Sequence, residues 1–291
     1  MSRELPADRD LAAALEHHVR ELAGNIGERH VYRYEALQTA AAYVRAQLGD
    51  GAKEHGFEVA GRTVSNLELV VGGDRSRGAL VIGAHYDSAP GCPGADDNPS
   101  GVAVVIELAR LARERPPAAE VRFVAFVNEE PPYFQTAQMG SLVYARQLKA
   151  NGVDVRGMVS IESVGYYTDA PRSQVYPPPF HLFFPDRGNF LGMVSDFASF
   201  RLLRQAAAAF RRATRLRLIA SPAPADVPGV GWSDHWSFWQ QGYRALMVTD
   251  TVPYRNPHYH TSRDTPDTLD YQRLAAATRG LWGVVERLTA R

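Results

Sequence analysis

The chain has 291 residues, of which 45% are hydrophobic, and its 32 acidic residues balance its 32 basic ones. This length and composition allow one large α/β domain with a substantial core. A formal net charge of zero excludes the strongly basic surface of a typical nucleic-acid-binding protein. The single cysteine, Cys92, excludes an internal disulfide and any CxxC metal site.

The N-terminal stretch, MSRELPADRDLAAALEHH, carries charges throughout and lacks the apolar core of a signal peptide. No stretch approaches the ~18 consecutive apolar residues that a membrane span requires. We therefore expect a cytoplasmic protein with no membrane partner. An exported protein whose leader lies outside this sequence would look the same.

Amphipathic patterns predict helices near the start of the chain, and apolar runs then alternate with helical ones. We expect helices over residues 10–23, 34–49, 101–114, 141–150, about 197–213 and 269–289, and strands over 57–60, 66–71, 79–85, 121–128, 157–163 and 244–250. Strands that are apolar throughout are buried on both faces, which indicates a mainly parallel sheet between helical layers.

Residues 164–231 interrupt this alternation with aromatic and Pro/Gly-rich runs such as YPPPFHLFFPDRGNF. The segment is too short to have a core of its own. We therefore expect a single domain over residues 1–291 with a lid-like insertion at about 164–231.

Acidic and histidine side chains gather where the predicted strands end. They are His85 and Asp87, then Asp96 and Asp97 in GADDNPSG, then Glu129 and Glu130, then Glu162, and finally His258, His260 and Asp264. Each one alone fits a solvated turn or a hydrogen-bonded strand end. Ligands bind at the carboxyl ends of strands in open α/β sheets. Gathering this many uncompensated acids at those ends costs free energy unless cations are bound there. The pattern predicts a metal site.

Histidine and carboxylate ligands without cysteine suit catalytic Zn²⁺, with Mn²⁺ or Co²⁺ as competitors. Asp97 offers two oxygens and can bridge two ions. The spacing His85-x-Asp87 suits a carboxylate that holds the imidazole by its other nitrogen.

Together, the stretches GAHYDS, GADDNPSG, NEE, MGS, SIES, SDHWSF and HYHTSRDT resemble the co-catalytic zinc aminopeptidases of clan MH. These leucyl aminopeptidase-like zinc exopeptidases share their clan with glutamate carboxypeptidase II-like enzymes and glutaminyl cyclases. The resemblance implies a phosphorylase/hydrolase-like three-layer α/β/α sandwich with a mixed, mostly parallel central sheet.

The resemblance also implies a site with two zinc ions and a peptide substrate. His85 and Glu162 would hold one ion, Glu130 and His260 the other, and Asp97 would bridge them. Glu129 would be the general base, and the Asp97–Asn98 peptide would be cis. Two positions depart from the family: Glu162 stands where Asp is common, and PPYFQTAQM replaces a glycine-rich stretch.

We expect an aminopeptidase that releases an apolar N-terminal residue, because surplus negative charge at such a site attracts an ammonium group. Tyr259 either donates to the developing oxyanion or packs in the core. The aromatic residues expected either to line an apolar substrate pocket or to pack in the core are Tyr133, Phe134, Tyr166 and Trp232.

Three alternatives remain open at this stage. A glutaminyl cyclase would use one zinc, although cyclases usually carry Ser where this chain has Asn98. A carboxypeptidase would need a cation such as Arg255 or Arg263 for the substrate carboxylate. A non-catalytic binding relative would be expected to have lost part of the ligand set. The sequence leaves the exact substrate, the physiological metal and the oligomeric state open.

Overall fold

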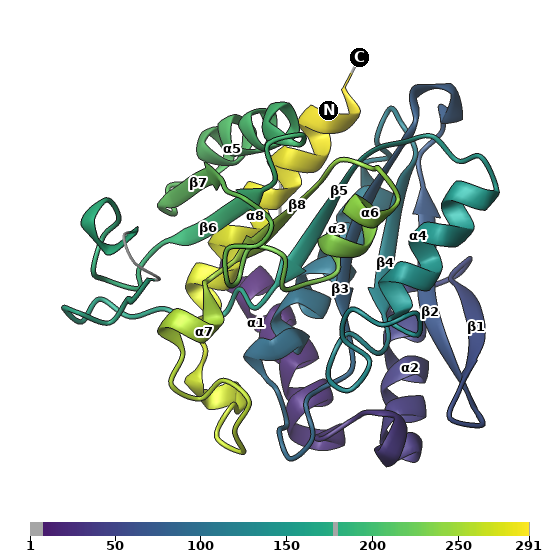
Figure 1. The fold of residues 1–291 in the computed structure, drawn as a ribbon, viewed down its shortest axis with the longest axis horizontal. Coiled ribbons are helices and arrows are strands. Elements are labelled where there is room, and N and C mark those ends of the chain that lie inside the picture. The colour runs from purple at the N-terminus through teal and green to yellow at the C-terminus, as the bar shows by residue number, and fades with distance from the viewer. Residues whose placement is uncertain (1–7, 177–179, 291) are drawn as a thin grey trace.

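Apolar runs form the strands of one sheet in the computed structural model, which describes residues 8–176 and 180–290 (Figure 1). In this part of the chain the sheet has eight strands, in the order β1-β2-β4-β3-β5-β8-β6-β7. Their bounds are β1 Lys53–Val59, β2 Arg62–Val71, β3 Ala79–His85, β4 Val121–Phe126, β5 Val155–Glu162, β6 Leu191–Ser195, β7 Leu218–Pro222 and β8 Ala245–Thr249.

The centre of the sheet is parallel and its margins are mixed. Strands β4, β3, β5 and β8 run parallel to one another, and β3 is buried along its whole length. On one side β2 and β1 pair antiparallel, and on the other β6 is antiparallel to β8 and parallel to β7. The mixed, mostly parallel sheet expected from the sequence is confirmed.

Helices cover both faces of the sheet. One layer contains α1 (Asp8–Val19), α2 (Tyr34–Leu48), α3 (Gly101–Glu114), α5 (Phe200–Ala213) and α8 (Tyr271–Thr289), whose buried residues share one large core with the sheet. The other layer contains α4 (Gly140–Ala150) and α6 (His235–Gln240) over a smaller core (Figure 1). The arrangement is the expected three-layer α/β/α sandwich.

Helices α5 and α8 pack closely because α8 carries glycine at the contact. A Cβ atom at Gly280 would lie 2.2 Å from Cε2 of Phe210, which is fully buried. A Cβ at Gly283 would lie 2.6 Å from the Cβ of Ala213. Any larger side chain would push the two helices apart.

The segment expected as a lid-like insertion, residues 164–231, contributes β6, α5 and β7 to the body of the domain. Strands β6 and β7, together with the chain on either side of these elements, border the cleft described below. The sequence patterns did not predict β6, β7, α6 or the short α7 (Val252–Arg255). Within the described residues, no helix is long and apolar enough to cross a membrane.

Candidate functional site

The ends of the central strands bring the expected ligand residues together. His85 is the last residue of β3 and Glu162 the last of β5. Glu130 follows β4, Asp97 lies in the kinked turn Asp96–Ser100 that leads into α3, and His260 lies in the loop after α7. We refer to these five residues as the ligand cluster. All are buried except His260, whose side chain is 33% exposed.

Asp97 lies between the two histidines and presents one oxygen to each. Its Oδ1 is 3.0 Å from Nε2 of His85, and its Oδ2 is 3.1 Å from Nε2 of His260. A second carboxylate accompanies each histidine. Oε2 of Glu162 lies 3.4 Å from Nε2 of His85, and Oε2 of Glu130 lies 3.2 Å from Nε2 of His260. The cluster therefore consists of two His/carboxylate sets that share Asp97.

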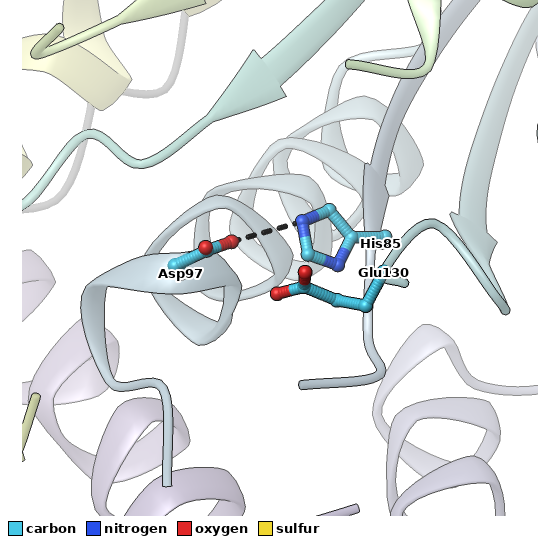
Figure 2. Close-up of side chains that lie close together, drawn as sticks. All are labelled: His85, Asp97 and Glu130. Carbon is cyan, nitrogen blue, oxygen red and sulfur yellow. Dashed lines mark ion pairs between the residues drawn. The ribbon is translucent and has the colours of Figure 1, made fainter. Parts of the chain in front are cut away.

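Several polar atoms of the cluster are buried without hydrogen bonds. Figure 2 shows the His85 ring beside Asp97 and Glu130, and a ligand atom from each of the three lies within 4.8 Å of the others. Neither ring nitrogen of His85, nor Oε1 of Glu130, has a hydrogen-bond partner among the described residues. Buried polar atoms are almost always satisfied. Unpartnered imidazole and carboxylate atoms converging on one point are a donor set that fits a Zn²⁺-type cation.

The charges of the cluster also favour the binding of a cation. Burial raises the pKa of Glu130 to about 7 and raises that of Glu162 above its ordinary value. Burial alone would lower the pKa of His260, but its contacts with Asp97 and Glu130 raise it to about 10. Like charges and desolvation both penalise the ionised carboxylates, and a divalent cation would remove that penalty.

Glu129 lies beside the cluster, and its carboxylate is farther from His85 than those of Asp97 and Glu162. Its Oε2 is 3.8 Å from Nε2 of His85, and burial raises its pKa well above the ordinary value. The backbone N–H groups of Glu129 and Glu130 both donate to the Asp87 carboxylate, each at 3.2 Å. The same carboxylate lies 3.5 Å from Nδ1 of His85 without hydrogen-bond geometry. In this structure Asp87 therefore holds the Glu129–Glu130 backbone and also faces the imidazole of His85.

The sequence patterns assigned no role to two residues that hydrogen-bond to the ligand cluster or to the backbone beside it. The Ser233 hydroxyl donates to Oε2 of Glu162 at 2.7 Å, and Asp264 accepts from the backbone N–H groups of Asp96 and Asp97. Both lie inside the motifs SDHWSF and HYHTSRDT. The motifs were therefore the available signal, although they did not say which atoms these side chains would contact.

The backbone around the cluster is strained. Asn128, Ser163 and His260 have φ values of 59°, 47° and 54°, a left-handed region that non-glycine residues seldom occupy. Each such conformation costs about 1–3 kcal/mol and persists where the surrounding structure enforces it, commonly at functional sites. The expected cis Asp97–Asn98 peptide is present.

A cleft of about 250 Å³ opens beside the ligand cluster. Asp97, Glu129, Glu130, Glu162 and His260 line one end of it. The remaining wall is mainly apolar and includes Phe134, Phe190, Met193, Ile219, Val230, Trp232 and Tyr254. None of the described residues that line it is Lys or Arg. A mainly apolar wall with polar groups at one end is typical of a small-molecule or peptide-end site.

The predicted pocket aromatics divide into two groups. Phe134 and Trp232 line the cleft, whereas Tyr133 and Tyr166 lie outside its lining. The ring of Tyr259 lines the cleft and stacks on His260, with ring centroids 3.8 Å apart. Burial and the nearby carboxylates raise the pKa of Tyr259, so its hydroxyl keeps its proton.

The two arginines considered for a substrate carboxylate do not line the cleft. Arg255 is buried, donates from Nε to Oε1 of Gln174 at 2.8 Å, and lies over the ring of Phe190, 4.5 Å from its centroid. Arg263 is exposed. Among the described residues, the cleft therefore offers no Lys or Arg side chain for a carboxylate.

Comparisons with known proteins show which sequences and folds this chain resembles. A protein of Escherichia coli (strain K12), the uncharacterized YfbL, is 37% identical over 92% of this chain and 85% of its own length. A probable leucine aminopeptidase of Arthroderma otae is 26% identical over 91% of this chain and 67% of its own length. The structure of a zinc aminopeptidase from Bacillus subtilis has the same fold, with a TM-score of 0.75 and 17% identity over 97% of this chain and 96% of that one.

A family model adds the strongest of these findings. Residues 66–285, which include every member of the ligand cluster, match the model of peptidase family M28. The expected metallopeptidase is thereby confirmed: the chain belongs to peptidase family M28.

Proposed function

We propose that the protein is a di-zinc aminopeptidase that releases an apolar residue from the free N-terminus of a peptide. One observation carries this proposal. Asp97 presents its two oxygens to two different His/carboxylate sets, at 3.0 Å and 3.1 Å, at the end of a cleft whose other walls are mainly apolar. The names of the relatives, a probable leucine aminopeptidase and a zinc aminopeptidase, support it.

His85 and Glu162 would hold one ion, Glu130 and His260 the other, and Asp97 would bridge the two. When bound, zinc supplies Lewis-acid chemistry, polarising the scissile carbonyl and lowering the pKa of a water molecule. Five ligand residues are more than one tetrahedral ion with an open position requires.

Glu129 acts as the general base in this proposal. It lies in the cleft beside both sets, and its carboxylate is not the closest partner of either histidine. It takes the proton of the attacking water and passes it to the leaving amine. The Tyr259 hydroxyl, also in the cleft, donates a hydrogen bond to the oxyanion that develops on the scissile carbonyl.

The charge of the cleft favours an N-terminal amine over a C-terminal carboxylate. Asp97, Glu129, Glu130 and Glu162 face it, and the described lining contains no Lys or Arg. A desolvated cleft of this sign attracts an ammonium group and repels a carboxylate. The mainly apolar remainder of the wall supports selection of an apolar first side chain.

Hydrolysis of four matched peptides tests the proposal: one with both ends free, its N-acetylated form, its C-terminally amidated form, and the same peptide with glutamine first. We expect acetylation to abolish cleavage and amidation to leave it nearly unchanged. Cleavage that survives acetylation but is lost on amidation would establish a carboxypeptidase. Pyroglutamate formation without hydrolysis of any peptide would establish a cyclase.

Elemental analysis of the purified protein tests the metal part independently. We expect two equivalents of zinc per chain, or two gained when zinc is added to chelator-treated protein. A single equivalent, with no more gained on titration, would contradict the two-ion site.

A further inference from the structure

A fully buried carboxylate, Asp264, holds the loop that carries the shared ligand Asp97. Its Oδ1 accepts the backbone N–H of Asp96 at 3.0 Å, and its Oδ2 accepts the N–H of Asp97 at 3.3 Å. Its own carbonyl accepts the N–H of Ala95 at 3.0 Å. One residue therefore fixes three successive N–H groups that lead to Asp97.

Asp264 belongs to the same loop as the ligand His260. The turn between them is closed by backbone bonds from Thr261 N to the His258 carbonyl at 3.0 Å and from Asp264 N to the Thr261 carbonyl at 3.1 Å. The side chains of Asp97 and His260 meet at 3.1 Å. The two loops are thus joined twice, once through backbone N–H groups and once at the ligand atoms.

An acid at position 264 is unfavourable in itself, because it is buried near the carboxylates of Asp96 and Asp97, and like charges repel. An asparagine would avoid the repulsion, but its side chain offers one acceptor oxygen and one NH₂ donor. Here the two adjacent N–H groups bond to two different oxygens, and a carboxylate of this size provides both without presenting a donor to either N–H. Asp87 holds the N–H groups of Glu129 and Glu130 in the same way.

We propose that Asp264 is a positioning residue that sets Asp97 at the distance from His260 needed for a shared metal ion. The proposal rests on the two-ion function above. The Asp264 carboxylate hydrogen-bonds to the backbone of Asp96 and Asp97 and not to His85 or Glu162, whereas its loop carries His260 directly. Its loss should therefore weaken the ion held by Glu130 and His260 more than the ion held by His85 and Glu162.

Zinc titration of the chelator-treated Asp264→Asn variant by calorimetry tests this, with Co²⁺ absorption spectra as a second readout of ligand geometry. We expect one ion to bind nearly as in the wild type and the other to bind 10–100-fold more weakly, the usual effect of losing a residue that orients a ligand. The Co²⁺ spectrum of the weakened site should change as well.

Glu68→Gln is the matched control. Glu68 is another buried carboxylate, 3% exposed, and its partners are His55, Arg122 and Tyr144, none of which belongs to the ligand cluster. The change from carboxylate to amide is the same in both variants. We expect the control to lower the melting temperature while both zinc affinities and the Co²⁺ spectrum stay as in the wild type.

Unchanged affinities and spectrum in Asp264→Asn would overturn the positioning role, and so would an equal weakening of both ions. If that variant does not fold, Asp264→Glu is judged by the same criterion, because it keeps two acceptors but moves them along a longer side chain. A single equivalent in the wild-type protein would instead overturn the two-ion function, and this inference with it. The two failures are therefore distinguishable.

Discussion

Under the proposed mechanism, replacing Glu129 by glutamine should separate the loss of catalysis from the loss of metal binding. The side chains are nearly isosteric, and the backbone N–H of residue 129 can still donate to Asp87. Oε2 of Glu129 lies 3.8 Å from Nε2 of His85, whereas Glu130 lies 3.2 Å from its histidine, His260. The substitution should therefore remove a proton acceptor from the cleft and leave the ligand cluster nearly intact.

The expected loss of rate follows from the one role that the substitution removes, that of the general base. A general base contributes a factor of about 10²–10⁴ to the rate, which corresponds to about 2.7–5.4 kcal/mol in the activation free energy. We expect kcat to fall by that factor while KM changes little, because Glu129→Gln alters no apolar wall of the cleft.

The assay combines steady-state hydrolysis of a free-amine peptide with zinc analysis of the same samples. Glu129→Gln should keep the zinc content of the wild type, whereas the matched variant Glu130→Gln should lose zinc. If Glu129→Gln loses zinc and Glu130→Gln keeps it, the roles within the pair are reversed. Near-normal kcat in a zinc-loaded Glu129→Gln protein would refute general-base catalysis by this residue.

Ser233→Ala removes the 2.7 Å hydrogen bond to Glu162, and calorimetry should show one zinc bound 10–100-fold more weakly. Gly280→Ala places a Cβ 2.2 Å from the Phe210 ring, so urea unfolding should show a loss of about 1–3 kcal/mol. Burial alone would raise the pKa of Glu68, but hydrogen bonds from a histidine and a tyrosine hold it below the ordinary value. Its contribution to stability is therefore present above the ~4.3 of a free glutamate and is lost as the pH falls below it. Glu68→Gln should accordingly flatten the acid limb of the unfolding free energy, and an unchanged acid limb would contradict this.

The central elements could be predicted from the sequence because local pattern and tertiary environment agree there. Residues 79–85 and 101–114 have the same bounds in the structure as in the sequence analysis. Strands β6 and β7 were not predicted. Each has five residues, lies at a margin of the sheet, and comes from a segment rich in aromatic and proline residues. The strand conformation of β6 depends on pairing with β8, and that of β7 on pairing with β6. Such tertiary effects routinely override weak local propensity.

The gathering of the candidate ligand residues could be predicted because they follow buried strands, and the carboxyl ends of parallel strands meet at one edge of the sheet. The cleft wall was harder to predict. Tyr133 and Phe134 are neighbours in one loop, yet only Phe134 lines the cleft. Aromatic content identifies a loop as a candidate wall, but the direction of each side chain depends on backbone angles that composition does not fix.

The adjacent acids Asp96 and Asp97 show why a charge pattern underdetermines a site. Asp97 faces the two histidines, whereas Asp96 turns away and accepts from Gly165 N and from Nδ2 of Asn256, each at 2.9 Å. Asp96 thereby ties the Asp97 loop to the segment after β5 and to the chain that leads into the His260 loop. The two like charges are tolerated side by side because they point into different environments, one towards the ligand cluster and one towards hydrogen-bond donors. Their order in the sequence does not reveal which is which, since only the fold determines which N–H groups each carboxylate meets.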